Sequence, residues 1–374
     1  MNGLKFPFKK NGSARDAPVC ISWACAVWFK QYTHSCCFFF RAIFFAQKMF
    51  GETFKHFTIH FNANNPRVTF SSGDFMAGQI SFDLSKETKL SSITLTLNGK
   101  AKVQWTTQGG GGGRRGRRRR QRRVHSARLE FFNFSQIVMQ ENNAVPNTTL
   151  QPGTHVYPFT CQIPQGNFPS SFHGVHGSII YSMKVEIHRP WHLAKEFVTE
   201  FNFASHIDAN QPHLLAPLAG SNTKTLCCLW CASGPISMTV CTERKGFVPG
   251  EMVKIICELS NGSSRTVTPH ATLIQKQMFY THNKCNRRLQ MKNLASVDGQ
   301  PVNPSSSEVY SDMMLPIPPN TTLTISNCPI LEVDYTVDVS LRIRGSTDLK
   351  VLFPIVLCNI PVYAPQPPPP YQQQ

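Results

Sequence analysis

Residues 157–191 read YPFTCQIPQGNFPSSFHGVHGSIIYSMKVEIHRPW, and the last part of this stretch alternates between apolar and polar side chains. The apolar positions are Ile179, Tyr181, Met183, Val185 and Ile187. Because successive side chains of a β-strand point to opposite faces, the alternation predicts a strand with one buried face and one wet face. Nine residues at about 3.3 Å each would make a strand of ~30 Å. Such a long strand favours a large antiparallel β-sandwich over a nucleotide-binding α/β fold.

The composition indicates a folded chain whose basic charge is local. The 374 residues have room for two or three domains, and 41% hydrophobic residues suffice for packed cores. The formal net charge of +17 is typical of a nucleic-acid binder. However, residues 114–123 (RRGRRRRQRR) carry eight arginines, and residues 1–48 hold a further excess of Lys and Arg. The rest of the chain is therefore nearly neutral.

Cysteine usage and the absence of a clear leader point to a reducing compartment. The thirteen cysteines are odd in number and irregularly spaced, which favours free thiols. Residues 17–29 are apolar, but they lack a convincing cleavage site and are too short to span a bilayer. We therefore expect a cytoplasmic protein. The alternative is a secreted or surface β-sandwich protein, which glycans at the Asn-x-Ser/Thr triplets of Asn261 or Asn320 would favour.

The sequence divides into two β-rich blocks with unusual additions. Residues 1–48 show no periodicity and are expected to form an atypical, disordered extension before Met49. Residues 49–208 predict a first sandwich, in which Asn98-Gly99 is a strong hairpin-turn signal and the Gly/Arg-rich segment 109–123 is a loop insertion. Residues 209–225 are rich in Pro and small residues and predict a linker. Residues 226–362 predict a second sandwich, and 363–374 are a Pro-rich tail.

An internal repeat supports this division. The turn Phe70-Ser-Ser-Gly-Asp recurs as Phe247-Val-Pro-Gly-Glu. The strand that begins at Tyr181 recurs as Tyr335-Thr-Val-Asp-Val-Ser-Leu. Two copies of one sandwich are the economical interpretation.

The segments HGSIIYSMKVEIHRPW, CCLWCASGPIS and ERKGFVPGE, with the Pro-Pro-x-Tyr tail, together resemble the α-arrestins, the arrestin domain-containing proteins. The resemblance covers about residues 49–362 and the tail. It implies an all-β fold of two tandem arrestin-like, immunoglobulin-type β-sandwich domains with disordered termini. It also implies a non-catalytic adaptor that links HECT-type ubiquitin ligases to membrane receptors and transporters for ubiquitination, endocytosis and trafficking. Such an adaptor would be cytoplasmic, with recruitment to the plasma membrane and endosomes.

The tail motif is the strongest candidate for a binding site. Prolines hold a segment in the polyproline II conformation, so little conformational entropy remains to be lost on binding. WW domains bind such segments in an aromatic groove. We expect Pro368, Pro369 and Tyr371 to bind a WW domain of the ligase. Family members usually carry two Pro-Pro-x-Tyr motifs in a longer tail, whereas this sequence has one.

The arginine run is the second candidate. It would attract a polyanion, RNA or acidic lipid, through eight side chains: Arg114, Arg115, Arg117, Arg118, Arg119, Arg120, Arg122 and Arg123. The plain alternative is a solvated loop. No aromatic residue for base stacking is interleaved, so specific nucleic-acid binding is not expected.

The sequence contains no recognised constellation for catalysis. A G-x-S-x-G elbow, an H-E-x-x-H motif and a P-loop are all missing, so we expect no enzyme activity and no cofactor. Cys227, Cys228 and Cys231 include a C-x-x-C pair, but zinc would need two further ligands. We expect buried structural thiols there, with palmitoylation as an alternative, and no metal site.

Overall fold

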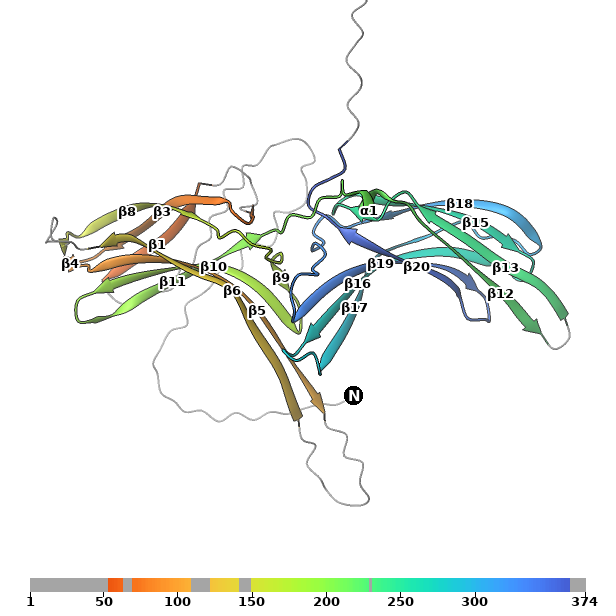
Figure 1. Ribbon diagram of the computed structural model, residues 1–374, viewed down its shortest axis with the longest axis horizontal. Helices are drawn as coiled ribbons and strands as arrows, with labels where there is room; N and C mark the ends of the chain where they lie inside the picture. The colour runs from red at the N-terminus through yellow and green to blue at the C-terminus, as the bar shows by residue number, and fades with distance from the viewer. Residues whose placement is uncertain (1–52, 63–68, 109–121, 141–148, 229–230, 364–374) are drawn as a thin grey trace, which may run out of the picture. The chain divides into compact units, whose positions relative to one another are not determined.

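The computed structural model describes residues 53–62, 69–108, 122–140, 149–228 and 231–363 (Figure 1). All of them belong to one compact unit, residues 41–374. The expected extension 1–48 and the tail 364–374 lie outside the described residues. Within the described part, no helix is long and apolar enough to cross a membrane.

The first sandwich is built from eleven strands in the described part of the chain. A three-stranded sheet has the order β1-β3-β8, and it faces a sheet of order β2-β11-β10-β5-β6 in which β9 also pairs with β10. A short sheet joins β4 to β7. The strands are β1 (Phe54–Phe61), β2 (Thr69–Phe70), β3 (Phe75–Leu84), β4 (Thr88–Lys89), β5 (Ser92–Gln108), β6 (Arg122–Gln140), β7 (Thr149–Leu150), β8 (Gly153–Gln162), β9 (Phe172–His173), β10 (Gly177–Arg189) and β11 (His192–Phe203).

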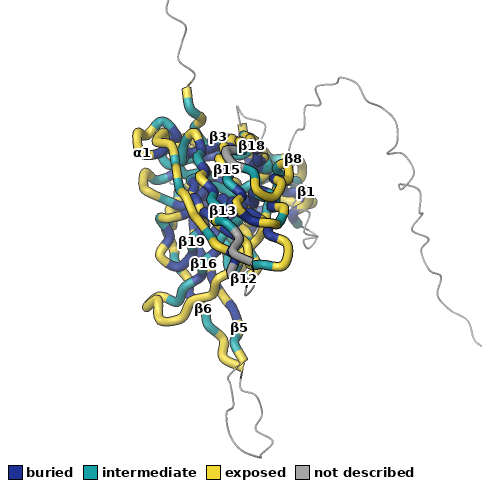
Figure 2. The backbone as a smooth tube through the Cα atoms, turned by 90° about the vertical axis from the view of Figure 1, so that its right-hand side faces the viewer, coloured by how far each residue is buried: buried dark blue, intermediate teal, exposed yellow. Residues whose placement is uncertain are grey.

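The second sandwich repeats this plan. A sheet of order β12-β13-β15-β18 faces a sheet of order β14-β20-β19-β16-β17. Its strands are β12 (Leu218–Cys228), β13 (Cys231–Thr242), β14 (Gly246–Phe247), β15 (Met252–Asn261), β16 (Val267–Tyr280), β17 (Arg287–Asp298), β18 (Ser306–Pro316), β19 (Leu331–Ile343) and β20 (Leu349–Leu357). The predicted fold of two tandem all-β sandwiches is confirmed. Figure 2 shows buried residues along the strands of both sandwiches.

The alternation in the central strand predicted its buried face correctly. Ile179, Tyr181, Met183, Val185 and Ile187 are all fully buried on β10. β10 is an interior strand, hydrogen-bonded to β5 on one side and β11 on the other. The face predicted to be wet is only half-exposed, and Ser182 on that face is buried. An interior strand has a neighbour on each side, so the side chains on both of its faces are less exposed than those of an edge strand.

The repeated turn has the same hydrogen bonds in both sandwiches. The Asp74 carboxylate accepts from the Ser71 amide at 2.7 Å, and the Glu251 carboxylate accepts from the Val248 amide at 2.8 Å. Gly73 and Gly250 hold φ values of 83° and 99°, a region that glycine enters without a Cβ clash. The repeated sequence therefore encodes one repeated turn.

The hairpin turn predicted at Asn98-Gly99 is wrong. Both residues lie inside the 17-residue strand β5. Gly99 faces Tyr181 across the register, and a Cβ at Gly99 would lie 2.7 Å from the Tyr181 ring. Glycine is needed here because an aromatic ring covers the backbone, a tertiary cause that a local turn signal does not reveal. β5 instead pairs with β6, and residues 109–121 connect these two strands.

The range 209–225, expected as a linker, contains regular structure. Helix α1 spans Pro212–Leu215, and β12 begins at Leu218 and pairs with β13. β12 is an edge strand, and its first residues are small and polar. An edge strand needs little apolar surface, so its composition is easily mistaken for that of a linker.

Candidate functional site

The residues predicted to bind partners are mostly outside the described part of the chain. Pro368, Pro369 and Tyr371 lie beyond Tyr363, the last described residue. Of the arginine run, only Arg122 and Arg123 are described. Both are exposed at the start of β6, where they pair with Gln108 and Thr107 of β5. The structure thus places this end of the run on a strand and does not test the other six arginines.

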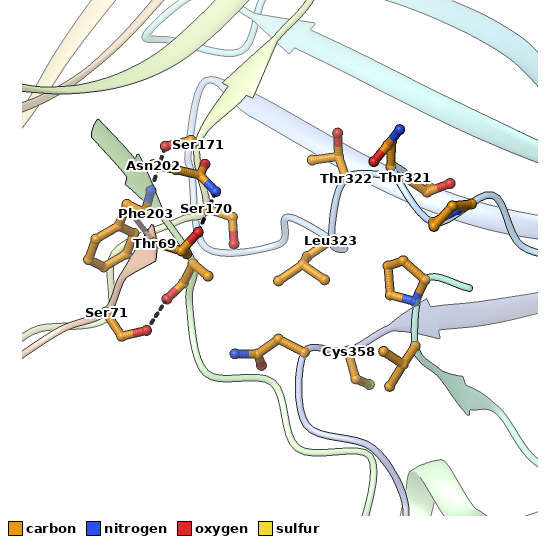
Figure 3. Close-up of a pocket in the computed structure, with 16 residues that line it drawn as sticks. Thr69, Ser71, Ser170, Ser171, Asn202, Phe203, Thr321, Thr322, Leu323 and Cys358 are labelled. Carbon is orange, nitrogen blue, oxygen red and sulfur yellow. Dashed lines mark hydrogen bonds between the residues drawn. The ribbon is translucent and has the colours of Figure 1, made fainter. Parts of the chain in front are cut away.

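A pocket of about 760 Å³ lies between residues of the two sandwiches (Figure 3). The first sandwich contributes the ends of β2 and β11 and the segment before β9, and the second contributes the repeated turn, the segment before β19 and the end of β20. The lining residues are Thr69, Ser71, Ser170, Ser171, Asn202, Phe203, Ala204, Val248, Pro249, Pro319, Asn320, Thr321, Thr322, Leu323, Cys358 and Asn359. No acidic or basic side chain is among them.

The polar groups of the pocket are largely engaged within their own sandwich. The Ser71 hydroxyl donates to the Ala204 carbonyl at 2.8 Å, and the Phe203 amide donates to the Ser171 hydroxyl at 2.9 Å. These bonds are drawn in Figure 3. A neutral lining of hydroxyls and amides suits a neutral polar ligand or a peptide backbone, and it offers no general acid or base.

Two buried tyrosines hold the segments that line the pocket. The Tyr181 hydroxyl donates to the Pro169 carbonyl at 2.6 Å, directly before Ser170. At the equivalent place in the second sandwich, the Tyr335 hydroxyl donates to the Thr322 carbonyl at 2.6 Å. Burial raises the pKa of both phenols, so they remain protonated donors. The sequence predicted that both rings are buried, but it did not reveal the carbonyls that their hydroxyls reach.

Hydrogen bonds and an aromatic contact also connect the two sandwiches. The Ile207 amide donates to the Asn359 side chain at 2.7 Å, and the Asn327 side chain donates to that of Asn167 at 2.8 Å. The His176 ring meets the buried Phe279 ring edge-on at 5.6 Å. Desolvation, with the charge of Arg288, lowers the pKa of His176 and keeps this contact neutral.

The described cysteines give no sign of a metal centre. Cys241 and Cys257 lie in β13 and β15, and Cys257 is buried. Burial, with the nearby Cys241 and Asp312, raises the pKa of Cys257 to about 12, which disfavours the metal-binding thiolate. Cys228 and Cys231 pair across the β12–β13 turn, while their side chains are outside the described set. Within the described residues no group of three His, Cys, Asp or Glu is placed to hold a metal ion.

One hydrogen-bonded series in the second sandwich has the order of a nucleophilic triad. His270 lies between Asp298, at 2.7 Å, and the Thr272 hydroxyl, at 2.9 Å. Arg342 also bonds Asp298 at 3.0 Å. The series joins β16, β17 and β19 across one sheet face, and the Thr272 hydroxyl is buried. We interpret it as a cross-strand polar ladder.

Two β-sandwiches built on one repeated plan and joined at a neutral polar pocket define an arrestin-type two-domain protein. The family model of the arrestin (or S-antigen) N-terminal domain matches residues 57–210, and that of the arrestin C-terminal domain matches residues 232–362. The chain therefore belongs to the arrestin family, and the predicted resemblance to arrestin domain-containing proteins is confirmed.

Curated relatives agree with this assignment. Mouse arrestin domain-containing protein 4 is 32% identical over 292 residues, which cover 78% of this chain and 69% of that protein. The human counterpart is 30% identical over 78% of this chain and 68% of its own length. Human thioredoxin-interacting protein is 25% identical over 81% of this chain and 74% of its own length. Arrestin-family proteins are generally non-catalytic adaptors, and these relatives support an adaptor-type role for this chain.

Proposed function

We propose that this protein is a cytoplasmic adaptor that links a WW-domain ubiquitin ligase of the HECT type to membrane receptors or transporters. The observation that carries the proposal is the order of modules in the chain. The two arrestin domains together reach residue 362, and the sequence PPPPY follows at residues 367–371. Binding of the tail would bring the ligase to whatever the sandwiches hold, so that the cargo is ubiquitinated, endocytosed and sorted at the plasma membrane and endosomes.

The ligase contact would depend on Tyr371 and on Pro368 and Pro369. Prolines preset the polyproline II conformation, and the tyrosine fills the pocket next to the proline groove of a WW domain. A single short peptide of this kind binds with roughly micromolar affinity, about −8 kcal/mol. A second contact between the ligase and the sandwiches would raise the effective affinity strongly.

The cargo contact would depend on the sandwiches. We propose that they bind the cytoplasmic tail of a receptor or transporter. The pocket between them is neutral, and among its lining groups the exposed Asn320 side chain can pair with an extended peptide backbone. The absence of charged lining residues favours uncharged segments of the tail.

One feature of the second sandwich removes Asn261 as a glycan site that could support the secreted alternative. Asn261 is fully buried, and its side-chain nitrogen donates to the Arg265 and Asn303 carbonyls, both at 2.8 Å. A glycan on this nitrogen is therefore incompatible with the folded sandwich. Asn320 is exposed, so occupancy of that site is the informative test of secretion.

A titration of ligase WW domains against the full chain tests the proposal. We expect micromolar binding to the wild type and at least tenfold weaker binding to Tyr371→Ala, a loss of about 1.4 kcal/mol or more. Tyr363→Ala is the matched control, because Tyr363 is an exposed tyrosine near the same end of the chain but outside the motif. Equal binding by wild type and Tyr371→Ala, or no binding by either, would refute the ligase contact.

A further inference from the structure

An exposed tryptophan closes the hairpin between β10 and β11. Arg189 pairs with His192, so Pro190 and Trp191 are the two central residues of the turn. Trp191 is 102% exposed, and Leu193 next to it is 91% exposed. Trp191 also has a φ of 60°, a left-handed conformation that is unusual for a bulky residue. Neither side chain contributes to the core, so folding does not explain their presence.

The second sandwich provides an internal comparison. Hairpin β19–β20 occupies the equivalent position, since β2 pairs with β11 in parallel just as β14 pairs with β20. Its turn is Arg344-Gly-Ser-Thr-Asp348, and the left-handed position is taken by Gly345, with φ 73°. The same fold therefore closes this hairpin with polar residues and a glycine. The apolar turn is specific to the first sandwich.

The hairpin tip is held in place by its neighbours. The Ser91 amide donates to the His188 carbonyl at 2.9 Å, which fixes the base of the turn to the segment after β4. The Arg189 guanidinium lies over the Phe54 ring at 5.2 Å, and His192 Nδ1 donates to the Pro190 carbonyl at 2.7 Å. Figure 1 shows β4 and the β10–β11 turn at the same end of the first sandwich. The tip thus presents Trp191 and Leu193 in a fixed geometry.

The surroundings of the tip are basic. The segments 85–91 and 188–195 contain four Lys or Arg residues and one carboxylate, Glu87. Lys86 and Lys89 are exposed, Lys195 is half-buried, and Arg189 is half-buried against Phe54. The next carboxylates along the hairpin, Glu186 and Glu196, face each other across the register, and Glu186 pairs with Lys184 at 2.9 Å. An exposed Trp and Leu within a cationic rim match the interface of an anionic membrane, where indole rings lie at the headgroup level and Lys and Arg bind acidic lipids.

We propose that the β10–β11 turn inserts Trp191 and Leu193 into the interface of an anionic lipid membrane. This extends the membrane recruitment in the proposed function and does not depend on the ligase contact. Insertion of the turn would fix one end of the first sandwich against the bilayer. Because one exposed Trp and one Leu bury limited apolar area, binding would be reversible and would need the added attraction of the cationic rim.

The test measures the partition of the full chain into vesicles of phosphatidylcholine alone or with about 30% phosphatidylserine. The key variant is Trp191→Gly, because glycine adopts the positive φ without strain and should leave the thermal midpoint unchanged or higher. Leu352→Ser is the matched control, since it removes an exposed leucine from hairpin β19–β20. Brominated lipids quench the fluorescence of a tryptophan that enters the bilayer. If that tryptophan is Trp191, the quenching should be absent in Trp191→Gly.

In a background in which serine replaces the eight arginines of residues 114–123, we expect the chain and its Leu352→Ser variant to bind the anionic vesicles, and Trp191→Gly to bind at least tenfold more weakly. Added salt should weaken the binding. Absent binding, or binding and quenching that Trp191→Gly leaves unchanged, would overturn the proposal. Equal binding to neutral vesicles would overturn the role of the cationic rim. If Trp191→Gly binds vesicles as the wild type does but no longer binds a protein partner, the turn is a protein-binding site and the membrane proposal is wrong. None of these outcomes depends on the WW-domain titration, so the two proposals fail separately.

Discussion

Single hydroxyl groups hold the segments around the interdomain pocket. Tyr181→Phe or Tyr335→Phe would remove the donor to a carbonyl that lines or adjoins the pocket. A buried acceptor left without its partner costs about 1–3 kcal/mol, so we expect each variant to lower the free energy of unfolding by this amount. Urea unfolding measures it. Tyr363→Phe removes an exposed hydroxyl and should leave the free energy of unfolding unchanged. If all three variants have the same small effect, the buried hydroxyls do not hold these segments.

Buried thiols give the protein a defined alkaline sensitivity. Burial raises the pKa of Cys161 and Cys358 to about 11 and that of Cys257 to about 12, whereas an unfolded thiol titrates near 8.5. Because the folded chain keeps protons that the unfolded chain loses, this stabilisation is complete below about pH 8.5 and falls as the pH rises toward 11–12. The raised pKa values of Tyr181 and Tyr335 act in the same direction above about pH 10.

Urea unfolding between pH 8 and pH 11 tests this prediction. The free energy of unfolding should fall over this interval, and Cys257→Ala should show a shallower fall from its own lower starting value. The exposed Cys285 provides the control, because Cys285→Ala should leave the slope unchanged. A wild-type stability that is constant over the interval would show that these thiols ionise equally in the folded and unfolded chain.

At the scale of the element, β5 shows where local sequence signals succeed and fail. Alternation predicted the buried face of β10 residue by residue, because the period of a strand depends only on residues that are neighbours in the sequence. The Asn98-Gly99 signal failed because the glycine leaves room for the Tyr181 ring, which lies on another strand. The pocket could not be predicted for the same reason, since its lining comes from segments between Thr69 and Asn359. Trp191 is visible in the sequence as an apolar residue at the end of an alternating strand.

Gly99→Ala tests the tertiary origin of this glycine. Its Cβ would lie 2.7 Å from the Tyr181 ring and 3.0 Å from the Phe132 ring. Overpacking of this kind costs about 1–3 kcal/mol, so we expect a loss of that size in urea unfolding. Lys102→Ala on the exposed face of β5 should be nearly neutral. A neutral Gly99→Ala would mean that the ring can move aside.

The connection between β5 and β6 is expected to attract polyanions without affecting the fold. Replacing the eight arginines of residues 114–123 by serine should abolish salt-dependent binding to RNA or heparin, because charge neutralisation releases counterions. The thermal midpoint should remain unchanged. Arg287→Ser with Arg288→Ser is the control, since these two arginines are also exposed at the start of a strand. If the variant without the eight arginines still binds RNA or heparin, the arginine run is not the polyanion-binding site.

At the scale of the whole molecule, the two sandwiches share packing at Phe279. This ring is fully buried on β16, yet it meets His176 and lies 3.0 Å from the Cβ position of Gly177 in the first sandwich. Phe279→Ala should cost about 3–5 kcal/mol and separate calorimetric unfolding into two transitions. Phe353→Ala, within the second sandwich, should destabilise without separating them. One transition for Phe279→Ala would indicate that other contacts couple the sandwiches.

The central claim is that the chain bridges a ligase to a membrane, and vesicle flotation of a labelled WW domain tests it most directly. With anionic vesicles, the wild-type chain should carry the WW domain to the floating fraction. Tyr371→Ala should float without the WW domain. In the background in which serine replaces the eight arginines of residues 114–123, Trp191→Gly should leave both in solution. If the wild-type chain floats while the WW domain stays behind, the protein is not a ligase adaptor.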